Sequence, residues 1–339
     1  MTTASRKIKL IDVARDAGVS PATVSRAIAQ PELLSGETLA RVRASAQRLG
    51  YLPDGAARAL ASGRSMTIGA IVPTLDSAIF ARALQAMQAT LAQEGYLLLV
   101  VSHDSSAAAE TKAVRALLGR GVDGLMLVGA ERAPETTALL QASQLPVVMT
   151  WVGDDAFPSV TIDNQRAGWL AAQHLIDLGH RRIGMITGHL QFNDRQNARL
   201  AGARAAMHAA GLSMPDHLIV EEPLTLAGGR AGCATLLELD PMPTALIGGI
   251  DLFAIGCIEE AHSRGMRVPE ALSVVGIDGL DMSAHLSPSL TTVHVPTARI
   301  GQMAALKLIA QVRGEAFEPQ TELPIELVIR RSSAIQAGG

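Results

Sequence analysis

Short apolar segments alternate with amphipathic segments throughout residues 66–339, and this alternation limits the fold more than any other feature of the chain. The apolar segments are rich in Val, Ile and Leu, which is typical of strands buried on both faces of a sheet. Strands that alternate with helices favour a parallel sheet covered by helices on both sides. Because the rhythm runs through two similar halves, this region is predicted to form two lobes, each built on a doubly wound parallel sheet.

Polar residues stand directly after several of these predicted strands. In doubly wound sheets, ligands bind in the crevice at the carboxyl ends of the strands. We therefore expect a ligand site between the two lobes. The predicted strands are Ile68–Val72, Tyr96–Val101, Gly124–Val128, Pro146–Trp151, Val160–Ile162, Arg182–Thr187, Leu218–Glu221, Thr244–Gly248 and Ser273–Ile277.

Residues 8–50 follow a different pattern, that of three short helices without strands. The first is predicted over Leu10–Ala17 and ends at Gly18, a residue that readily takes the left-handed conformation after a helix. Ser20 can cap the second helix, and Pro21 then falls at its first position, where the missing N–H costs nothing. Two short helices joined by a tight glycine turn predict a helix-turn-helix.

The charge of this head distinguishes two interpretations of its helices. The whole chain has 339 residues and a formal net charge of −3. Residues 1–65 contain ten basic and five acidic residues, so the head carries +5 and the remainder −8. The helical pattern alone is equally consistent with a packing module that has no contact with DNA. A basic head on an acidic body favours DNA binding.

The second helix of the head is then the recognition helix, whose N-terminal residues reach base edges in the major groove. Ala22 can contact a thymine methyl group, and Arg26 can bond guanine through two donors. The predicted contacts with bases come from Pro21, Ala22, Thr23, Ser25 and Arg26.

Two ordered motifs, "LIDVARDAGVSPATVSRAI" and "LSGETLARVRASAQRLGYLPDGAARALASGRS", resemble the lactose and galactose repressor (LacI/GalR) family. Further segments such as "HLIDLGHRRIGMITG" and "VPEALSVVGID" are similar to its sensor domain, which resembles periplasmic sugar-binding proteins. The resemblance covers nearly the whole chain. It implies an all-α helix-turn-helix head with a hinge helix, followed by a two-lobed α/β domain of the periplasmic-binding-protein kind.

The resemblance also implies domain boundaries. The helix-turn-helix would occupy residues 8–50, the hinge helix and linker 51–65, and the effector-binding domain 66–339. The chain would cross between lobes near Asp163, Thr292–Val295 and Leu323. The implied N-lobe is about 66–162 plus 296–322, and the implied C-lobe is about 163–291 plus 326–336.

In this family the hinge helix enters the minor groove at the centre of the operator. Carried over by position, Leu60 is the apolar wedge and Ala57 lies beside it, although Leu60 could instead pack on the body as a linker residue. Lys9 stands where the family usually has Thr, and it can contact phosphate rather than accept a capping bond. Asp54 replaces a usual Asn, so details of operator affinity differ from the family. Ser20 completes the implied DNA contacts.

Effector contacts of the family fall on Asp76, Phe80, Asp163, Arg199 and Asp278. Carboxylates can accept two hydroxyl groups, as recognition of a polyol requires.

One further arginine extends this predicted site. Arg195 lies one turn before Arg199 on the same helix, so both guanidinium groups can face the ligand. Two arginines indicate an anionic ligand, such as a sugar phosphate or a sugar acid like gluconate. A solvent-facing Arg195 is an equally weighted alternative.

Asp163 and Asp251 each stand at the start of a predicted helix, so each has an alternative role. Asp163 can act as a helix N-cap, with or without a ligand role. For Asp251 the N-cap interpretation is preferred. Ile250 and Gly279 replace a usual Asn and Asp, which removes a sugar contact of the family.

Other functional classes are disfavoured. The chain contains no GxGxxG after a strand, no Walker P-loop and no nucleophile elbow, so an enzyme is not predicted, and neither is a cofactor. The histidines are scattered and predict no metal site. The two cysteines, Cys233 and Cys257, are expected to be small buried hydrophobes.

A polar N-terminus without a signal sequence and the absence of long apolar segments predict a cytoplasmic protein without a membrane span. The remaining alternative is a sugar-binding protein of the periplasmic fold without a DNA role, which the basic head argues against.

The predicted function is therefore transcription regulation by a repressor. We expect a homodimer that binds palindromic operator DNA under the control of a small metabolite, a sugar or sugar acid. Whether the metabolite induces or corepresses is left open by the sequence.

Overall fold

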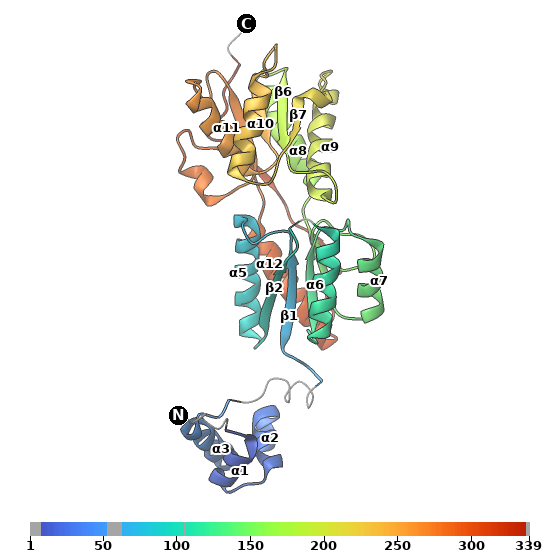
Figure 1. Ribbon diagram of the computed structural model, residues 1–339, viewed down its shortest axis with the longest axis vertical. Coiled ribbons are helices and arrows are strands. Elements are labelled where there is room, and N and C mark those ends of the chain that lie inside the picture. The colour runs from blue at the N-terminus through green and yellow to red at the C-terminus, as the bar shows by residue number, and fades with distance from the viewer. Residues whose placement is uncertain (1–7, 53–62, 105, 337–339) are drawn as a thin grey trace, which may run out of the picture. The chain divides into compact units, whose positions relative to one another are not determined.

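The computed structural model describes residues 8–52, 63–104 and 106–336. The contacts divide the chain into two units, residues 1–67 with 121–123 and residues 68–120 with 124–339. Figure 1 shows the small helical unit in blue and the larger α/β unit in the remaining colours. The predicted fold class, a helical head followed by a two-sheet α/β domain, is confirmed.

The head consists of α1 (Leu10–Ala17), α2 (Pro21–Ala29), a 3-10 turn (Pro31–Leu33) and α3 (Gly36–Leu49). Gly18 ends α1 with a φ of 65°, in the left-handed region that favours glycine. Gly50 ends α3 in the same way, with a φ of 64°. The predicted end of α1 at Gly18 and the predicted start of α2 at Ser20 and Pro21 are confirmed.

A small core holds these helices together. Its buried side chains are Val13, Ala14, Ala17, Val24, Ala27 and Val42. The buried Ser45 hydroxyl donates to the carboxylate of Asp16 at 2.5 Å, and Arg48 forms an ion pair with the same carboxylate. α1 and α3 are thereby joined by polar contacts as well as by apolar packing.

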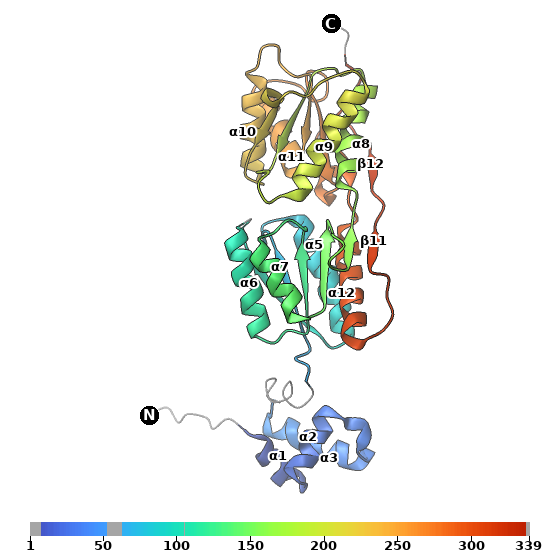
Figure 2. The ribbon, with the colours of Figure 1, turned by 90° about the vertical axis from the view of Figure 1, so that its right-hand side faces the viewer.

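The N-lobe of the larger unit is built on a six-stranded sheet in the order β11-β5-β4-β3-β1-β2. Helices α5 and α12 pack together, as do α6 and α7, and the two pairs cover opposite faces of the sheet (Figure 2). Its elements are β1 (Thr67–Val72), α5 (Ala78–Gln93), β2 (Leu97–Ser102), α6 (Ala107–Gly119), β3 (Gly124–Val128), α7 (Pro134–Ser143), β4 (Val147–Trp151), β5 (Ser159–Thr161), α12 (Thr297–Arg313) and β11 (Gln320–Glu322).

The C-lobe repeats this architecture with a sheet in the order β12-β10-β9-β8-β6-β7. Helices α8 and α9 form one packed pair, and α10 and α11 form the other. Its elements are α8 (Asn164–Asp177), β6 (Ile183–Thr187), α9 (Asp194–Ala209), β7 (Ile219–Glu221), α10 (Leu226–Leu237), β8 (Ala245–Gly248), α11 (Asp251–Ser263), β9 (Ser273–Asp278), β10 (Thr291–His294) and β12 (Glu326–Val328), with 3-10 turns at Asp216–Leu218 and Asp281–Ala284.

Two details of the lobes differ from the expectation. β12 runs antiparallel to β10, whereas the other recorded pairings are parallel. β10 pairs with β9 in the C-lobe sheet and was not among the predicted strands, so the chain leaves this lobe after His294, near the expected crossing.

The α8–α9 pair is unusually close because two glycines face backbone. A Cβ atom on Gly168 would lie 1.8 Å from the carbonyl oxygen of Arg199, and one on Gly202 would lie 1.8 Å from that of Gln165. No side chain larger than hydrogen fits at either position. The close approach brings the N-terminus of α8 next to the middle of α9, where Arg199 lies.

Candidate functional site

The recognition helix α2 has one buried and one exposed face. Val24 and Ala27 are buried in the head core. Around them, Ser20, Pro21, Ala22, Ser25 and Arg26 are exposed and Thr23 is half-buried. The residues predicted to contact DNA therefore share a surface that does not contribute to the core.

Local hydrogen bonds fix the start of this helix. The Ser20 Oγ accepts from the Thr23 backbone N–H at 3.1 Å and lies 2.9 Å from the Thr23 hydroxyl, which is the predicted N-cap. Lys9 is exposed, and its backbone N–H donates to Asp12 at the start of α1. Among the residues that the structure describes, Arg26 has no ion-pair partner, so its guanidinium group is available to DNA. Ala57 and Leu60, the predicted hinge contacts, lie outside the described residues.

A cavity lies between the two lobes at the carboxyl ends of β1, β6 and β9. Four residues predicted to bind effector line it together: Phe80 from the N-lobe and Arg195, Arg199 and Asp278 from the C-lobe. The cavity, here called the inner cavity, has a volume of about 40 Å³. Its other lining residues are Pro73, Thr74, Ser77, Ala78, Ile79, Asn193, Gln196, Leu224, Ile250, Leu252 and Leu280.

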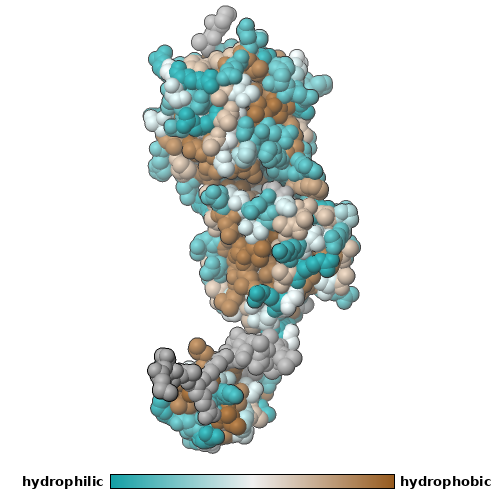
Figure 3. All heavy atoms as spheres, in the orientation of Figure 1, coloured by the Kyte–Doolittle hydropathy of each residue, from teal (hydrophilic) through white to brown (hydrophobic). Residues whose placement is uncertain are grey.

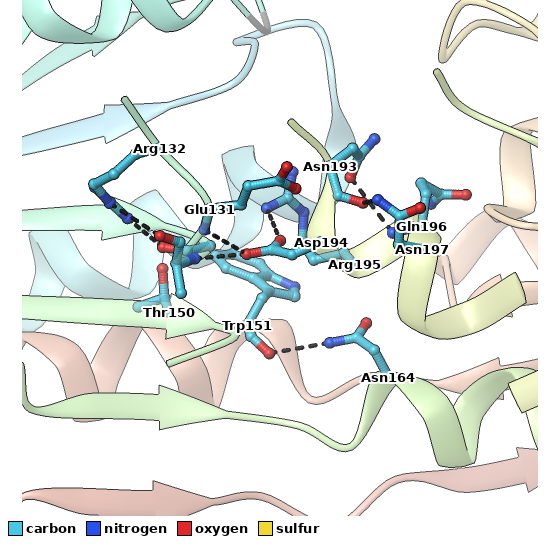
Figure 4. A network of polar contacts seen from close by, with 12 residues as sticks. Glu131, Arg132, Thr150, Trp151, Asn164, Asn193, Asp194, Arg195, Gln196 and Asn197 are labelled. Atoms are coloured by element: carbon cyan, nitrogen blue, oxygen red, sulfur yellow. Dashed lines mark hydrogen bonds and ion pairs between the residues drawn. The ribbon is translucent and has the colours of Figure 1, made fainter. Parts of the chain in front are cut away.

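Arg199 is the central cation of this cavity and is only 1 % exposed. Its Nη1 donates to the Asp278 carboxylate at 3.1 Å and to the Gly249 carbonyl at 2.7 Å, while Nε donates to Asn164 Oδ1 at 3.1 Å. The Asn164 amide in turn donates to the Trp151 carbonyl at 3.0 Å, where β4 of the N-lobe ends (Figure 4). The guanidinium group is thus held in one orientation by C-lobe groups, and one of these, Asn164, is itself bonded to the N-lobe.

Asp278 is buried and its backbone has a φ of 136°, an unfavourable value for a residue with a side chain. Burial raises the pKa of its carboxyl to about 7, against the lowering effect of Arg199, and the nearby Asp251 carboxylate adds to the rise. Close to neutral pH this group can therefore take up a proton. Such a proton would leave the charge of Arg199 free for an anionic ligand.

The N-cap interpretation of Asp251 is wrong. The N-cap of α11 is Ile250, and Asp251 is the fully buried first residue of the helix. Its carboxylate instead accepts from Thr292 Oγ1 at 2.5 Å, Leu280 N at 2.8 Å and Ser283 Oγ at 2.7 Å. It therefore fastens the segments around β10 to the site, which no local sequence pattern revealed.

Arg195 is not solvent-facing, because only 12 % of its side chain is exposed. It pairs with Asp194 at 2.9 Å, and the same carboxylate accepts from the backbone N–H groups of Ala130 and Glu131 in the N-lobe (Figure 4). Burial lowers the pKa of the Arg195 guanidinium, and Asp194 counteracts this. Asp194 thus links the two lobes beside the inner cavity.

Two predicted effector residues lie apart from the inner cavity. Asp163 caps α8, where its carboxylate accepts from Arg166 N at 2.7 Å, and Asp76 lies in the exposed turn before α5. Neither lines the cavity.

Sequence reasoning missed Asn193 and Gln196, both of which line the inner cavity. Asn193 caps α9 by accepting from the Gln196 backbone N–H. An Asn followed three residues later by Gln is a helix-start signature that could have revealed the pair.

The described residues contain no group of acidic, histidine or cysteine side chains that could hold a metal ion. In the same part of the chain, no helix is long and apolar enough to cross a membrane.

Comparisons with known proteins agree with both units. Residues 9–54 match the family model of bacterial regulatory proteins, lacI family, and residues 172–333 match that of a periplasmic binding protein-like domain. The catabolite control protein A of Priestia megaterium is 32 % identical over 96 % of this chain and 99 % of its own length.

Two solved structures are also similar to this chain over nearly its whole length. The lac repressor dimer bound to operator and the anti-inducer ONPF is 28 % identical, with a TM-score of 0.86 over 97 % of this chain and all of that one. The complex of the transcriptional regulator CelR with cellobiose is 29 % identical, with a TM-score of 0.72 over 96 % of this chain and 99 % of that one.

Proposed function

Because the chain belongs to the lacI family of bacterial regulatory proteins and is a DNA-binding transcription regulator, we propose that it is a repressor whose operator binding is controlled by a sugar acid such as gluconate. The observation that carries the proposal is the presence of two buried arginines, Arg195 and Arg199, in one cavity between the lobes. Two points need a test: whether the ligand is a sugar acid, and whether it weakens or strengthens operator binding.

The chemistry of the inner cavity supports an acidic polyol. A guanidinium group binds a carboxylate through two parallel donors, and this interaction is stronger where water is excluded. Asp278 and the Gln196 amide can bond hydroxyl groups, while Phe80 and Leu252 supply apolar contacts. Proton uptake by Asp278 would compensate the negative charge that the ligand brings. The CelR complex supports a sugar-like ligand for this kind of domain.

On the DNA side, α2 supplies base contacts through Ala22 and Arg26, and Lys9 supplies a phosphate contact. Leu60 and Ala57 of the hinge would fill the central minor groove of a palindrome. Asp76 and Asp163 do not line the cavity. They would contact the effector only in another arrangement of the lobes, one that brings them to the cavity.

A symmetric dimer is supported by the exposed edge of the N-lobe sheet. Strand β2 ends the sheet, and its Leu97 and Leu99 side chains are 70 % and 38 % exposed. Figure 3 shows apolar side chains gathered over α5 and β2. An uncovered apolar strand edge favours pairing with a second copy. Effector binding would shift the population of lobe arrangements and so separate the paired hinges.

The test is binding of selected palindromic DNA by fluorescence anisotropy in a salt series, with and without gluconate. Arg26→Ala is expected to lose about 1–3 kcal/mol of discrimination between the palindrome and random DNA. Arg43→Ala removes the same charge from the exposed surface of α3 and should keep the discrimination. Arg199→Lys should abolish the response to gluconate without changing DNA affinity. If wild type does not discriminate sequence at all, the chain is instead a sugar-binding protein of the periplasmic fold without a DNA role.

A further inference from the structure

A second cavity, here called the outer chamber, adjoins the inner cavity on the side of the loop between β6 and α9. The two share the lining residues Pro73, Thr74, Asn193 and Leu224, so they lie side by side. The outer chamber has a volume of about 460 Å³ and is lined by residues of both lobes. A ligand that enters the inner cavity can therefore extend into it.

The two volumes suit different parts of a ligand. At about 10–15 Å³ per water molecule, the inner cavity holds about three waters. This narrow space suits the end of an open-chain acid better than a pyranose ring. The outer chamber is about ten times larger and can hold a ring.

An aromatic side chain stands at the outer chamber in a strained conformation. Phe192 has a φ of 54°, which is rare for a bulky residue, and its side chain is 41 % exposed. Strain of this kind persists only where the surroundings fix the backbone, and it is concentrated at functional positions. Phe192 is not a core residue, because 41 % of its surface is exposed, so core packing does not explain the strain.

Hydrogen bonds on both sides hold the Phe192 backbone in place. The Asn197 amide donates to the carbonyl oxygens of Leu190 at 2.7 Å and of Asn193 at 3.1 Å. The Leu190 N–H donates to the Glu221 carboxylate at 3.0 Å. The loop is thus fastened to α9 and to β7, so the ring is presented at a fixed place.

Polar groups share the chamber with this ring. Gln191, Glu222 and Thr225 come from the C-lobe, and Asp104 comes from the N-lobe. Their oxygens can accept hydrogen bonds from several hydroxyl groups, while the aromatic face covers the C–H face of a sugar ring. An apolar platform surrounded by acceptors is the combination that a pyranose requires.

We propose that the outer chamber is a second sugar subsite and that the effector is a two-unit sugar acid, an aldobionic acid. Its open-chain acid end occupies the inner cavity at Arg195 and Arg199, and its pyranose ring packs on Phe192. This inference rests on the proposed effector class and specifies the second half of the ligand.

The test is calorimetric titration of the full chain with gluconate and with maltobionate, lactobionate and cellobionate, which carry the same acid end plus one ring. At least one two-unit acid is expected to bind ten or more times tighter than gluconate. Phe192→Ala should weaken that acid about two- to tenfold and leave gluconate unchanged, because stacking on one ring contributes that much. Phe192→Tyr should keep the affinity. Leu226→Ala removes an equally exposed apolar side chain outside both cavities and should change neither ligand.

The outcomes separate the two proposals. Gluconate that binds as tightly as every two-unit acid, or a Phe192→Ala effect that is equal for both ligands, overturns the second subsite and leaves the sugar-acid effector in place. If no sugar acid binds, the effector class is wrong and the subsite proposal fails with it.

Discussion

The close packing of α8 on α9 predicts that Gly168→Ala disrupts both stability and effector control. The added methyl group would meet the Arg199 carbonyl oxygen at 1.8 Å, so the helices must separate by about 1.5 Å to restore ordinary contact. Overpacking of this kind costs about 1–3 kcal/mol. The separation also breaks the buried bond between Asn164 and Arg199, and a bond to a charged group contributes about 1.5–3 kcal/mol. We expect a loss of about 3–5 kcal/mol in the free energy of unfolding.

Urea denaturation followed by Trp fluorescence measures this effect near its origin. The chain has two tryptophans, and one of them, Trp169, directly follows Gly168 on α8. Gly119→Ala is the matched control, because the added Cβ meets no neighbouring group within 4 Å. We expect the unfolding free energy of this variant to stay unchanged or to rise by up to about 1 kcal/mol, since alanine favours a helix more than glycine does. An unfolding free energy of Gly168→Ala within 1 kcal/mol of wild type, with an intact effector response, would refute the reasoning.

Two further predictions concern the buried aspartates. Asp251→Ala leaves two buried hydroxyl donors and the half-buried Leu280 N–H without their acceptor, so it should lower the unfolding free energy of the C-lobe by about 3–5 kcal/mol in urea melts. Asp216→Ala, which breaks only an exposed ion pair, should cost under about 1 kcal/mol. Similar losses for both variants would contradict the assigned role of Asp251. For Asp278, burial raises the folded-state pKa to about 7, so its contribution to stability is fully present below the unfolded value and is lost as the pH rises through 7. The affinity for gluconate, measured by calorimetric titration, should accordingly fall between pH 6 and pH 8 in wild type and stay level in Asp278→Asn. If the substitution does not alter the pH profile, Asp278 is excluded as the proton acceptor.

The sequence by itself determined the elements that depend on neighbours in the chain. Gly18 and Ser20 act through the backbone of the next few residues, so the ends of α1 and α2 could be predicted from their types. The alternation of apolar strands with helices fixed two parallel sheets, because only that arrangement buries both faces of such strands. Arg199 and Asp278 were predicted by resemblance, and the structure brings them together in one cavity.

Only the tertiary structure decided which side chains meet across long stretches of sequence. Asp251 precedes a helix just as Asp163 does, yet only Asp163 caps its helix, because Asp251 is buried against Thr292 and the 280–283 turn. Asp194 contacts the backbone of a loop 63 residues away, and no local pattern encodes that distance. The position of Phe192 depends on bonds from α9 and β7 that form only when the lobe is folded. Caps and turns are short-range interactions, whereas a ligand site is made by the packing of whole sheets and helices, which brings together residues that no single segment contains.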